Sequence, residues 1–366
     1  MTHASSLRMC VIGCIMAGSA MGSDSVPMPT IPYEPQTYDC ARTDHPPVID
    51  GVLESESWDS APWTDAFVDI VGPARPAPRH RTRVRMLWDA SHFYFAAELE
   101  EPHLWGTLTE RDAIIFHDND FEVFIDPDGD THHYYELEIN ALGTVWDLLL
   151  VKPYRDGGPA QHEWDIEGLQ SAVHLDGTLN DPADTDRRWT VEIAWPWTSF
   201  GAGAGVPSPP RPGDTWRVNF SRVQWHLEHS DGNYRKVMDP EKGKPLAEDN
   251  WVWSPQGLVN MHYPEMWGQV RFRGPSGHQE QPRVHPVAEA TRRALRQIYY
   301  AQRNHRAQHG SFTKDAKDLN LGLPTHPPHA PRITATDDAF EAILVLPNGN
   351  PWRIDHEGRC LPVDLD

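Results

Sequence analysis

Residues 111–153 read RDAIIFHDNDFEVFIDPDGDTHHYYELEINALGTVWDLLLVKP, and this stretch decides the fold. Apolar residues alternate with acidic or polar ones in 121–126 (FEVFID), and the alternation returns in 134–140 (YYELEIN). Successive side chains of a strand point to opposite faces, so each segment is predicted to be a strand with one apolar and one largely acidic face. The Pro, Gly and Asp residues of 126–130 are typical of the turn between them. The stretch therefore predicts an antiparallel hairpin whose carboxylates face away from the core.

Similar alternation elsewhere predicts a mainly β protein. Further strands are expected at 84–88, 93–97, 145–150, 189–195, 216–223 and 267–273. The chain of 366 residues has 34 Pro and 15 Trp, a composition that favours turns and loops over long helices. At this length about two domains are expected. The predicted fold class is an antiparallel immunoglobulin-like or jelly-roll-like β-sandwich, with a small C-terminal α+β appendage.

Composition divides the chain into five parts. Residues 1–22 are predicted to be a signal peptide, 23–37 a Pro-rich tether, 38–273 the β-sandwich, 274–285 a polar linker and 286–366 the appendage. Within the appendage, apolar residues at helical spacing between Pro286 and His309 predict one amphipathic helix, which Gly310 stops. Two strands are expected after it, at 339–346 and 352–355.

The first 22 residues indicate export. Arg8 precedes an apolar run from Met9 to Met21, and small residues stand at Ala20 and Gly22. This run is too short to span a bilayer, so no membrane span is expected. We expect a secreted, periplasmic or cell-envelope protein, with lipoprotein anchoring at Cys14 as the less favoured alternative.

Cleavage of this leader would leave Cys40 and Cys360 in an oxidising compartment. A disulfide between them and two unpaired thiols both remain open. The net charge of −21 makes nucleic acid and anionic membrane surfaces poor partners.

Four motifs occur in order along the predicted sandwich: VIDG at 48–51, VRMLWD at 84–89, DFEVFID at 120–126 and WGQVRF at 267–272. Together they resemble carbohydrate-binding module family 9, which is similar to the DOMON-like sandwiches, and the resemblance covers about 40–273. It implies an exported, non-catalytic domain that binds a saccharide or polysaccharide, is associated with glycan breakdown and contains structural Ca²⁺.

The resemblance also implies where a sugar would bind. It places a stacking aromatic at Phe116, a polar contact at Glu122 and the next strand's contact at Glu138, where the family has a basic residue. The second aromatic position falls near Met261 and His262, where no Trp stands, and nearby Trp253 is a substitute. The predicted ligand-binding residues are Phe116, Glu122, Glu138, Asn219, Arg222, Trp253, Met261 and His262.

An acidic run offers oxygen ligands of the kind that Ca²⁺ takes. The predicted metal residues are Asp118, Asp120, Asp126, Asp128 and Asp130. The Asp126-x-Asp128-x-Asp130 spacing is not an EF-hand, because Thr131 and Leu137 occupy its Gly and Glu positions. An ordinary acidic turn remains the alternative.

Three other functions stay open. Paired carboxylates among Glu122, Glu136, Glu138 and Glu192 would suit a glycoside hydrolase acting on O-glycosyl bonds. DOMON-like relatives also include haem-binding electron-transfer domains, for which Met261 with His262 or Met86 is considered, although adjacent strand residues face opposite ways. The sequence at 295–312 resembles the soluble helix of secretion pseudopilins, which implies a protein partner for the C-terminal helix.

Overall fold

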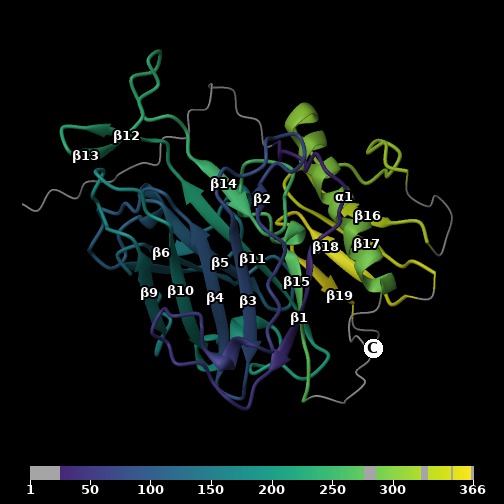
Figure 1. The fold of residues 1–366 in the computed structure, drawn as a ribbon. Helices are drawn as coiled ribbons and strands as arrows, with labels where there is room; N and C mark the ends of the chain where they lie inside the picture. The colour runs from purple at the N-terminus through teal and green to yellow at the C-terminus, as the bar shows by residue number, and fades with distance from the viewer. Residues whose placement is uncertain (1–24, 276–285, 323–328, 348, 364–366) are drawn as a thin grey trace, which may run out of the picture.

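The structure is a computed structural model that describes residues 25–275, 286–322, 329–347 and 349–363. The predicted signal peptide and most of the predicted linker therefore lie outside the described residues. The described part consists of a β-sandwich followed by a smaller α+β module (Figure 1). The predicted fold class is confirmed.

Two sheets form the sandwich, and strand β1 (Thr37–Arg42) belongs to both. The first sheet runs β8 (Ala160–Gln161), β7 (Val145–Leu150), β6 (Tyr134–Asn140), β5 (Asp120–Asp126), β11 (Thr215–Gln224), β15 (Gly268–Phe272) and β1, with β14 (Asp249–Val252) on β11 and β2 (Val68–Asp69) on β14. The second sheet runs β1, β3 (Thr82–Trp88), β4 (His92–Glu100), β10 (Arg188–Pro196) and β9 (Gln170–Asp176).

Strand β1 is the exception to the antiparallel pattern. Its first four residues pair in parallel with β15, and Ala41 and Arg42 then pair in parallel with β3. The other pairs between described strands are antiparallel. The N-terminal strand thus joins one edge of each sheet.

The sandwich core lies where the alternating patterns predicted it. Phe121, Val123 and Ile125 of β5 are fully buried against the facing sheet, as are Val191 and Ile193 of β10. Many Trp side chains share this core: Trp88, Trp189, Trp195, Trp197, Trp216, Trp251 and Trp253. The high Trp content therefore serves packing between the sheets more than the surface.

Short elements connect the strands. A separate hairpin consists of β12 (Leu227–Ser230) and β13 (Asn233–Lys236). The 3-10 helices are Glu56–Trp58, Ile115–His117, Tyr154–Asp156, Trp197–Ser199, Ala202–Ala204 and Pro264–Met266.

The C-terminal module contains the predicted helix, α1 (Pro286–His309), and a four-stranded antiparallel sheet. Its strands are β16 (Arg332–Ala335), β17 (Phe340–Leu344), β18 (Trp352–Asp355) and β19 (Cys360–Pro362). The two expected strands correspond to β17 and β18, whereas β16 and β19 were not predicted. Leu295, Ile298 and Tyr299 of α1 pack in the module's core.

Among the described residues, no helix has the length and apolar character needed to cross a membrane.

The segment 25–36 is extended but is not a free tether. It lies beside α1 and the sandwich (Figure 1), and Val26 is buried with its N–H bonded to Asn304 Oδ1 at 3.1 Å. Thr30 N donates to the Gly257 carbonyl at 3.2 Å, and Tyr33 OH donates to Glu289 Oε2 at 3.2 Å. Pro residues keep this segment extended, and apolar residues between them hold it in place.

The two cysteines of the predicted mature chain are free and buried in different cores. Cys40 packs within the sandwich, whereas Cys360 packs within the C-terminal module. Of the two alternatives, the structure contains the unpaired thiols.

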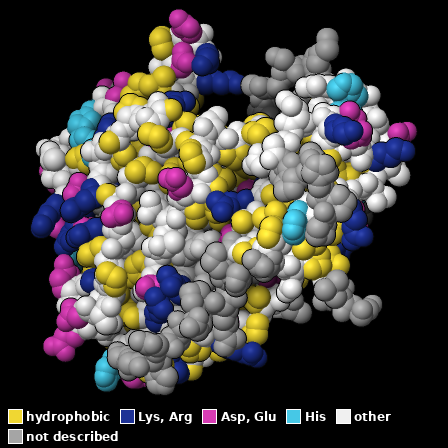
Figure 2. Space-filling view, turned by 90° about the vertical axis from the view of Figure 1, so that its right-hand side faces the viewer, with side chains coloured by type: hydrophobic (Ala, Val, Ile, Leu, Met, Phe, Trp, Pro, Cys, Tyr) yellow, Lys and Arg dark blue, Asp and Glu magenta, His cyan; other side chains and the backbone are white. Residues whose placement is uncertain are grey.

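Figure 2 shows the module side of the molecule, where hydrophobic side chains form several separate groups among charged and polar ones.

Candidate functional site

The candidate site lies on the outer face, which we define as the side chains of β5, β6, β7 and β11 that point away from the sandwich core. Strand register aligns Ser221, Glu122, Glu138 and Trp146 in one row across these strands. The next row contains Asn219, Phe124, Glu136 and Leu148. Glu122 and Glu138 are thus direct cross-strand neighbours, a position where like charges destabilise a sheet unless something compensates them.

These glutamates point away from the sandwich core, as predicted, but solvent does not reach them. Glu122 is 5% exposed, Glu136 4% and Glu138 2%. A second apolar layer covers the outer face, drawn mainly from the loop around the Ile115–His117 helix and from residues 252–267. The outer face is therefore a buried polar layer and not the open acidic surface that alternation alone indicates.

Burial changes the protonation of this layer. It raises the pKa of Glu122 to about 7, and with the nearby charge of Glu122 it raises the pKa of Glu136 and Glu138 well above the ordinary value. Asp120, which is fully buried, has a raised pKa for the same two reasons. Four carboxyl groups this close cannot all be ionised without a cation, so they share protons or hold a metal ion.

The donor set of this layer fits a hard cation. Asp120, Glu122 and Glu138 each offer an oxygen, and these atoms all lie within 4.8 Å of one another. Asp120 Oδ2 and Glu136 Oε2 are buried without a hydrogen-bond partner in the described structure. Unpartnered buried carboxylate oxygens are the ligands that Ca²⁺ takes.

The predicted metal residues do not form one site. The carboxylate oxygens of Asp118 are already hydrogen bonded within the protein. They accept from Thr107 N, Thr107 Oγ1, Leu108 N and Asn140 Nδ2. Asp120 and Asp126 stand at opposite ends of β5, about 20 Å apart for six strand steps. One ion therefore cannot contact both groups.

The Asp126–Asp130 turn is already supplied with donors. Its three carboxylates also converge within 4.8 Å. However, Asp126 accepts from Gly129 N and Thr131 N at 3.0 Å each, and Asp130 accepts from His132 N and pairs with Arg359 at 2.8 Å. Backbone amides and a guanidinium take the places that a cation would occupy. The turn fits the alternative reading of a structural acidic turn.

Phe116, Met261 and His262 lie over the outer face, as the sequence-based hypothesis requires. Phe116 is partly exposed, its N–H donates to Glu138 Oε2 at 2.9 Å, and its ring lies 6.4 Å from that of Trp146. Burial, with Arg155 nearby, lowers the pKa of His262 to about 3, so the imidazole is neutral.

Three other predicted ligand residues support the structure instead. Arg222 is fully buried and pairs with Glu101 at 2.9 Å on the inner side of the sheet. Trp253 packs in the sandwich core. Asn219 is on the outer face but fully buried, and its amide holds the backbone of Ser254 at both N and O. The structure therefore places none of these three where a sugar would reach it.

The structure also separates the residues considered for haem. Met86 is fully buried in the sandwich core, whereas Met261 lies in the apolar layer on the other side of the first sheet. His262 Nδ1 is hydrogen bonded to Tyr134 OH at 2.9 Å. One iron cannot contact both Met86 and Met261.

Sequence reasoning missed Tyr154 as a candidate contact. This residue is 47% exposed, and its ring centroid lies 4.6 Å from that of His262. It comes from the 3-10 turn Tyr154–Asp156, inside a turn-rich connection with no periodicity to follow. Only the folded structure places this aromatic ring beside the outer face.

Comparison with known proteins agrees with this architecture. Residues 49–203, which include β5, β6 and β7, match the family model described as carbohydrate family 9 binding domain-like. The chain is therefore a mainly β protein with a carbohydrate family 9 binding domain-like segment. No curated protein matches it.

Three solved structures are similar to this chain. A protein of Bacteroides uniformis, described provisionally as carbohydrate-binding, has a TM-score of 0.48 at 16% identity over 66% of this chain and 100% of its own. A family 9 carbohydrate-binding module from Caldicellulosiruptor kristjanssonii in complex with cellotriose has a TM-score of 0.42 at 15% identity, covering 69% and 100%. A family 9 carbohydrate-binding module from the same organism in complex with glucose has a TM-score of 0.42 at 14% identity, covering 68% and 100%.

Proposed function

We propose that this protein is an exported, non-catalytic carbohydrate-binding protein that holds a saccharide at the edge of the outer face. The observation that carries this proposal is the family-model match over 49–203, which contains the cross-strand row of Glu122, Glu138 and Trp146. The partly exposed Phe116 borders this row, whereas the exposed Tyr154 lies further along the outer face, beside His262. A module of this kind would serve the breakdown of glycans outside the cell.

Each side chain has a distinct part in this proposal. An aromatic face such as Phe116 suits the C–H groups of a sugar ring. Glu122 is buried, so it would not touch the sugar and would act through Glu138, its direct cross-strand neighbour. Glu138 acts as a positioning residue, because its bond from Phe116 N fixes the loop that presents the aromatic ring.

We also propose that Asp120, Glu122 and Glu138 hold a structural Ca²⁺. The ion would supply the positive charge that this buried layer otherwise lacks, and its support is the unpartnered Asp120 Oδ2. The residues themselves converge from neighbouring strands, so the backbone positions them before any ion binds.

Titration calorimetry with soluble mono- and oligosaccharides, in buffer with Ca²⁺, tests the proposal. We expect saturable binding without product for the wild type, and at least about tenfold weaker binding for Phe116→Ala and Glu122→Gln. Trp63→Ala is the matched control, because Trp63 is a partly exposed aromatic that packs against Arg83 and Arg85 away from the outer face. Wild-type affinity in both site variants would contradict the site, and heat from no sugar in the panel would contradict the function.

A second candidate, a glycoside hydrolase, is favoured by one observation. Glu122 has a pKa of about 7 and adjoins Glu138, and such a pair can act as acid and partner carboxylate. Release of reducing sugar that disappears in Glu122→Gln would establish it, whereas binding without turnover would leave the binding function.

Export rests on the leader-like residues 1–22. The proposed cleavage predicts a mature chain that begins at Ser23. Cell fractionation and N-terminal mass analysis of the native protein test it, and an intact Met1 in cytoplasmic protein would refute it.

A further inference from the structure

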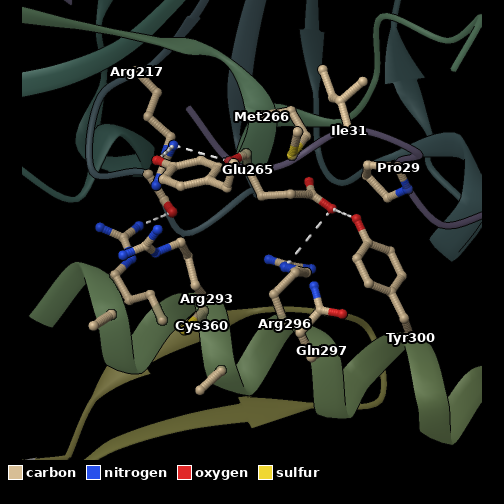
Figure 3. Close-up of a pocket in the computed structure, with 15 residues that line it drawn as sticks. Pro29, Ile31, Arg217, Glu265, Met266, Arg293, Arg296, Gln297, Tyr300 and Cys360 are labelled. Atoms are coloured by element: carbon tan, nitrogen blue, oxygen red, sulfur yellow. Dashed lines mark hydrogen bonds and ion pairs between the residues drawn. The ribbon is translucent and has the colours of Figure 1, made fainter. Parts of the chain in front are cut away.

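A cavity of about 320 Å³ lies between the sandwich, the segment 25–36 and helix α1. It adjoins the Arg217 end of the outer face, away from the row of Glu122, Glu138 and Trp146. Arg217 and Glu265 approach it from the sandwich, and Arg293, Arg296 and Tyr300 approach it from α1 (Figure 3). Its size is at the lower end of small-molecule sites, which suits a ligand about as large as one sugar unit.

Basic side chains dominate the wall of this cavity. The charged lining residues are Arg217, Arg292, Arg293, Arg296 and Glu265. The chain as a whole carries a net charge of −21, so four guanidinium groups against one carboxylate make this wall a local exception.

Neighbouring acids account for two of the four arginines. Glu289 pairs with Arg217 at 3.0 Å and with Arg292 at 3.2 Å. Asp126 and Asp128 lie close enough to interact electrostatically with Arg292. However, burial raises the pKa of both carboxyl groups, to about 7 for Asp128. These two arginines are therefore part of the structure that joins the turn to α1.

The remaining two arginines are less fully matched. Glu265 is paired mainly with Arg155 at 2.9 Å and lies 3.8 Å from Arg296 Nε. Arg296 is buried, its Nη2 donates to Thr131 Oγ1 at 3.3 Å, and its Nη1 has no hydrogen-bond partner in the described structure. Arg293 is exposed at the rim, with its guanidinium 5.1 Å from the ring of Tyr33.

The helix presents these groups on one side. Positions 290, 293, 294 and 297 of α1 lie on one helical face, so Arg293 and Gln297 stand beside Ala290 and Ala294. The two alanines leave room that longer side chains would fill. Across the cavity, Pro29, Ile31 and Met266 supply an apolar wall (Figure 3).

We propose that this cavity binds a small organic anion of about monosaccharide size, with its carboxylate or phosphate held by Arg293 and Arg296 and its less polar side against Ile31 and Met266. Guanidinium groups suit both oxyanions through charge-assisted hydrogen bonds. The proposal does not depend on the carbohydrate-binding function of the outer face, because the two sites share no residue.

Calorimetry on the full chain at low ionic strength tests this, with glucuronate and glucose 6-phosphate as acidic probes, and glucose and inorganic phosphate as comparisons. We expect saturable binding of at least one acidic sugar, and the tighter of the two identifies the preferred oxyanion. Arg293→Gln should weaken it by about tenfold or more. Ala294→Leu should do the same by filling the cavity. Arg332→Gln, which removes an exposed charge elsewhere in the same module, should leave the affinity unchanged.

Five results would overturn the proposal. Four of them are an absence of binding by either acidic sugar, equal affinity for glucose, binding of inorganic phosphate alone, and an equal loss in Arg332→Gln, which would indicate nonspecific attraction. Arg293 is exposed, so its variant tests the site even if Ala294→Leu does not fold. Loss of binding in Phe116→Ala would instead locate the anion on the outer face and would also refute the cavity.

Discussion

Replacing Glu265 by Gln should destabilise the protein, because this buried carboxylate joins the sandwich to helix α1. Glu265 pairs with Arg155 at 2.9 Å and accepts a hydrogen bond from Tyr300 OH on α1. Arg296 of the same helix lies 3.8 Å away. Gln keeps the shape of the side chain but removes the charge that Arg155 and Arg296 face.

The pKa of Glu265 sets the magnitude. Burial alone would raise this pKa, but Arg155 first, then Arg296 and Tyr300, lower it from 4.5 to about 2. A difference of about 2.5 pH units corresponds to about 3 kcal/mol of stabilisation by the ionised form. Breaking a buried ion pair on one side costs a similar amount, about 3–5 kcal/mol.

Urea unfolding followed by Trp fluorescence measures this difference. At pH 7 we expect Glu265→Gln to unfold about 3 kcal/mol more easily than the wild type, whereas Glu163→Gln, at an exposed glutamate, serves as the neutral control. The lowered pKa means that the stabilisation is complete above pH 4.5 and is lost as pH falls toward 2. The two unfolding curves should therefore converge between pH 4.5 and 2. A difference below about 1 kcal/mol at pH 7, or one that stays constant with pH, would refute the reasoning.

Three further predictions follow from the buried layers. Ca²⁺ should raise the melting temperature of the wild type but not of Asp120→Asn in scanning fluorimetry. A wild-type melting temperature that does not change when Ca²⁺ is added would exclude the metal site. In EDTA, the raised pKa of Glu122, about 7, means that stability falls as pH rises from 4.5 to 7; Glu122→Gln should reduce this fall by up to about 3 kcal/mol in urea titrations, and parallel curves would contradict it. Trp253→Ala should cost about 3–5 kcal/mol of unfolding free energy through the cavity it leaves in the sandwich core, and a near-neutral result would remove Trp253 from that core.

Side-chain alternation was enough to predict the hairpin of β5 and β6 and the face of each of its residues. The apolar residues of 121–125 form the core as expected, and the acidic ones lie on the opposite side. The same rule, applied consistently, also separates Asn219 from Arg222, because residues three apart on a regular strand face opposite ways. Arg222 indeed lies on the same side as Phe220, facing the second sheet.

Alternation does not say what covers the second face of a strand. Glu122 and Glu138 are buried because loops distant in sequence pack over them, including the layer that contains Met261 and Trp267. The contacts of the acidic turn were unpredictable for the same reason. Asp130 meets Arg359, which lies 229 residues away in the chain. Long-range packing of this kind leaves no periodic signal in a single sequence.

The joining strand β1 and the segment before it constrain the order in which this chain can fold. Val26 finds its partner at Asn304, 278 residues further along the chain, and β1 completes its pairing only when β15 is present. The earliest described residues must therefore wait for almost the whole sandwich, and for part of α1, to be synthesised before they reach their native positions. Contacts of such high sequence separation fold slowly, so an unoccupied sheet edge persists during synthesis. A chaperone that shields this edge would increase the yield of native protein.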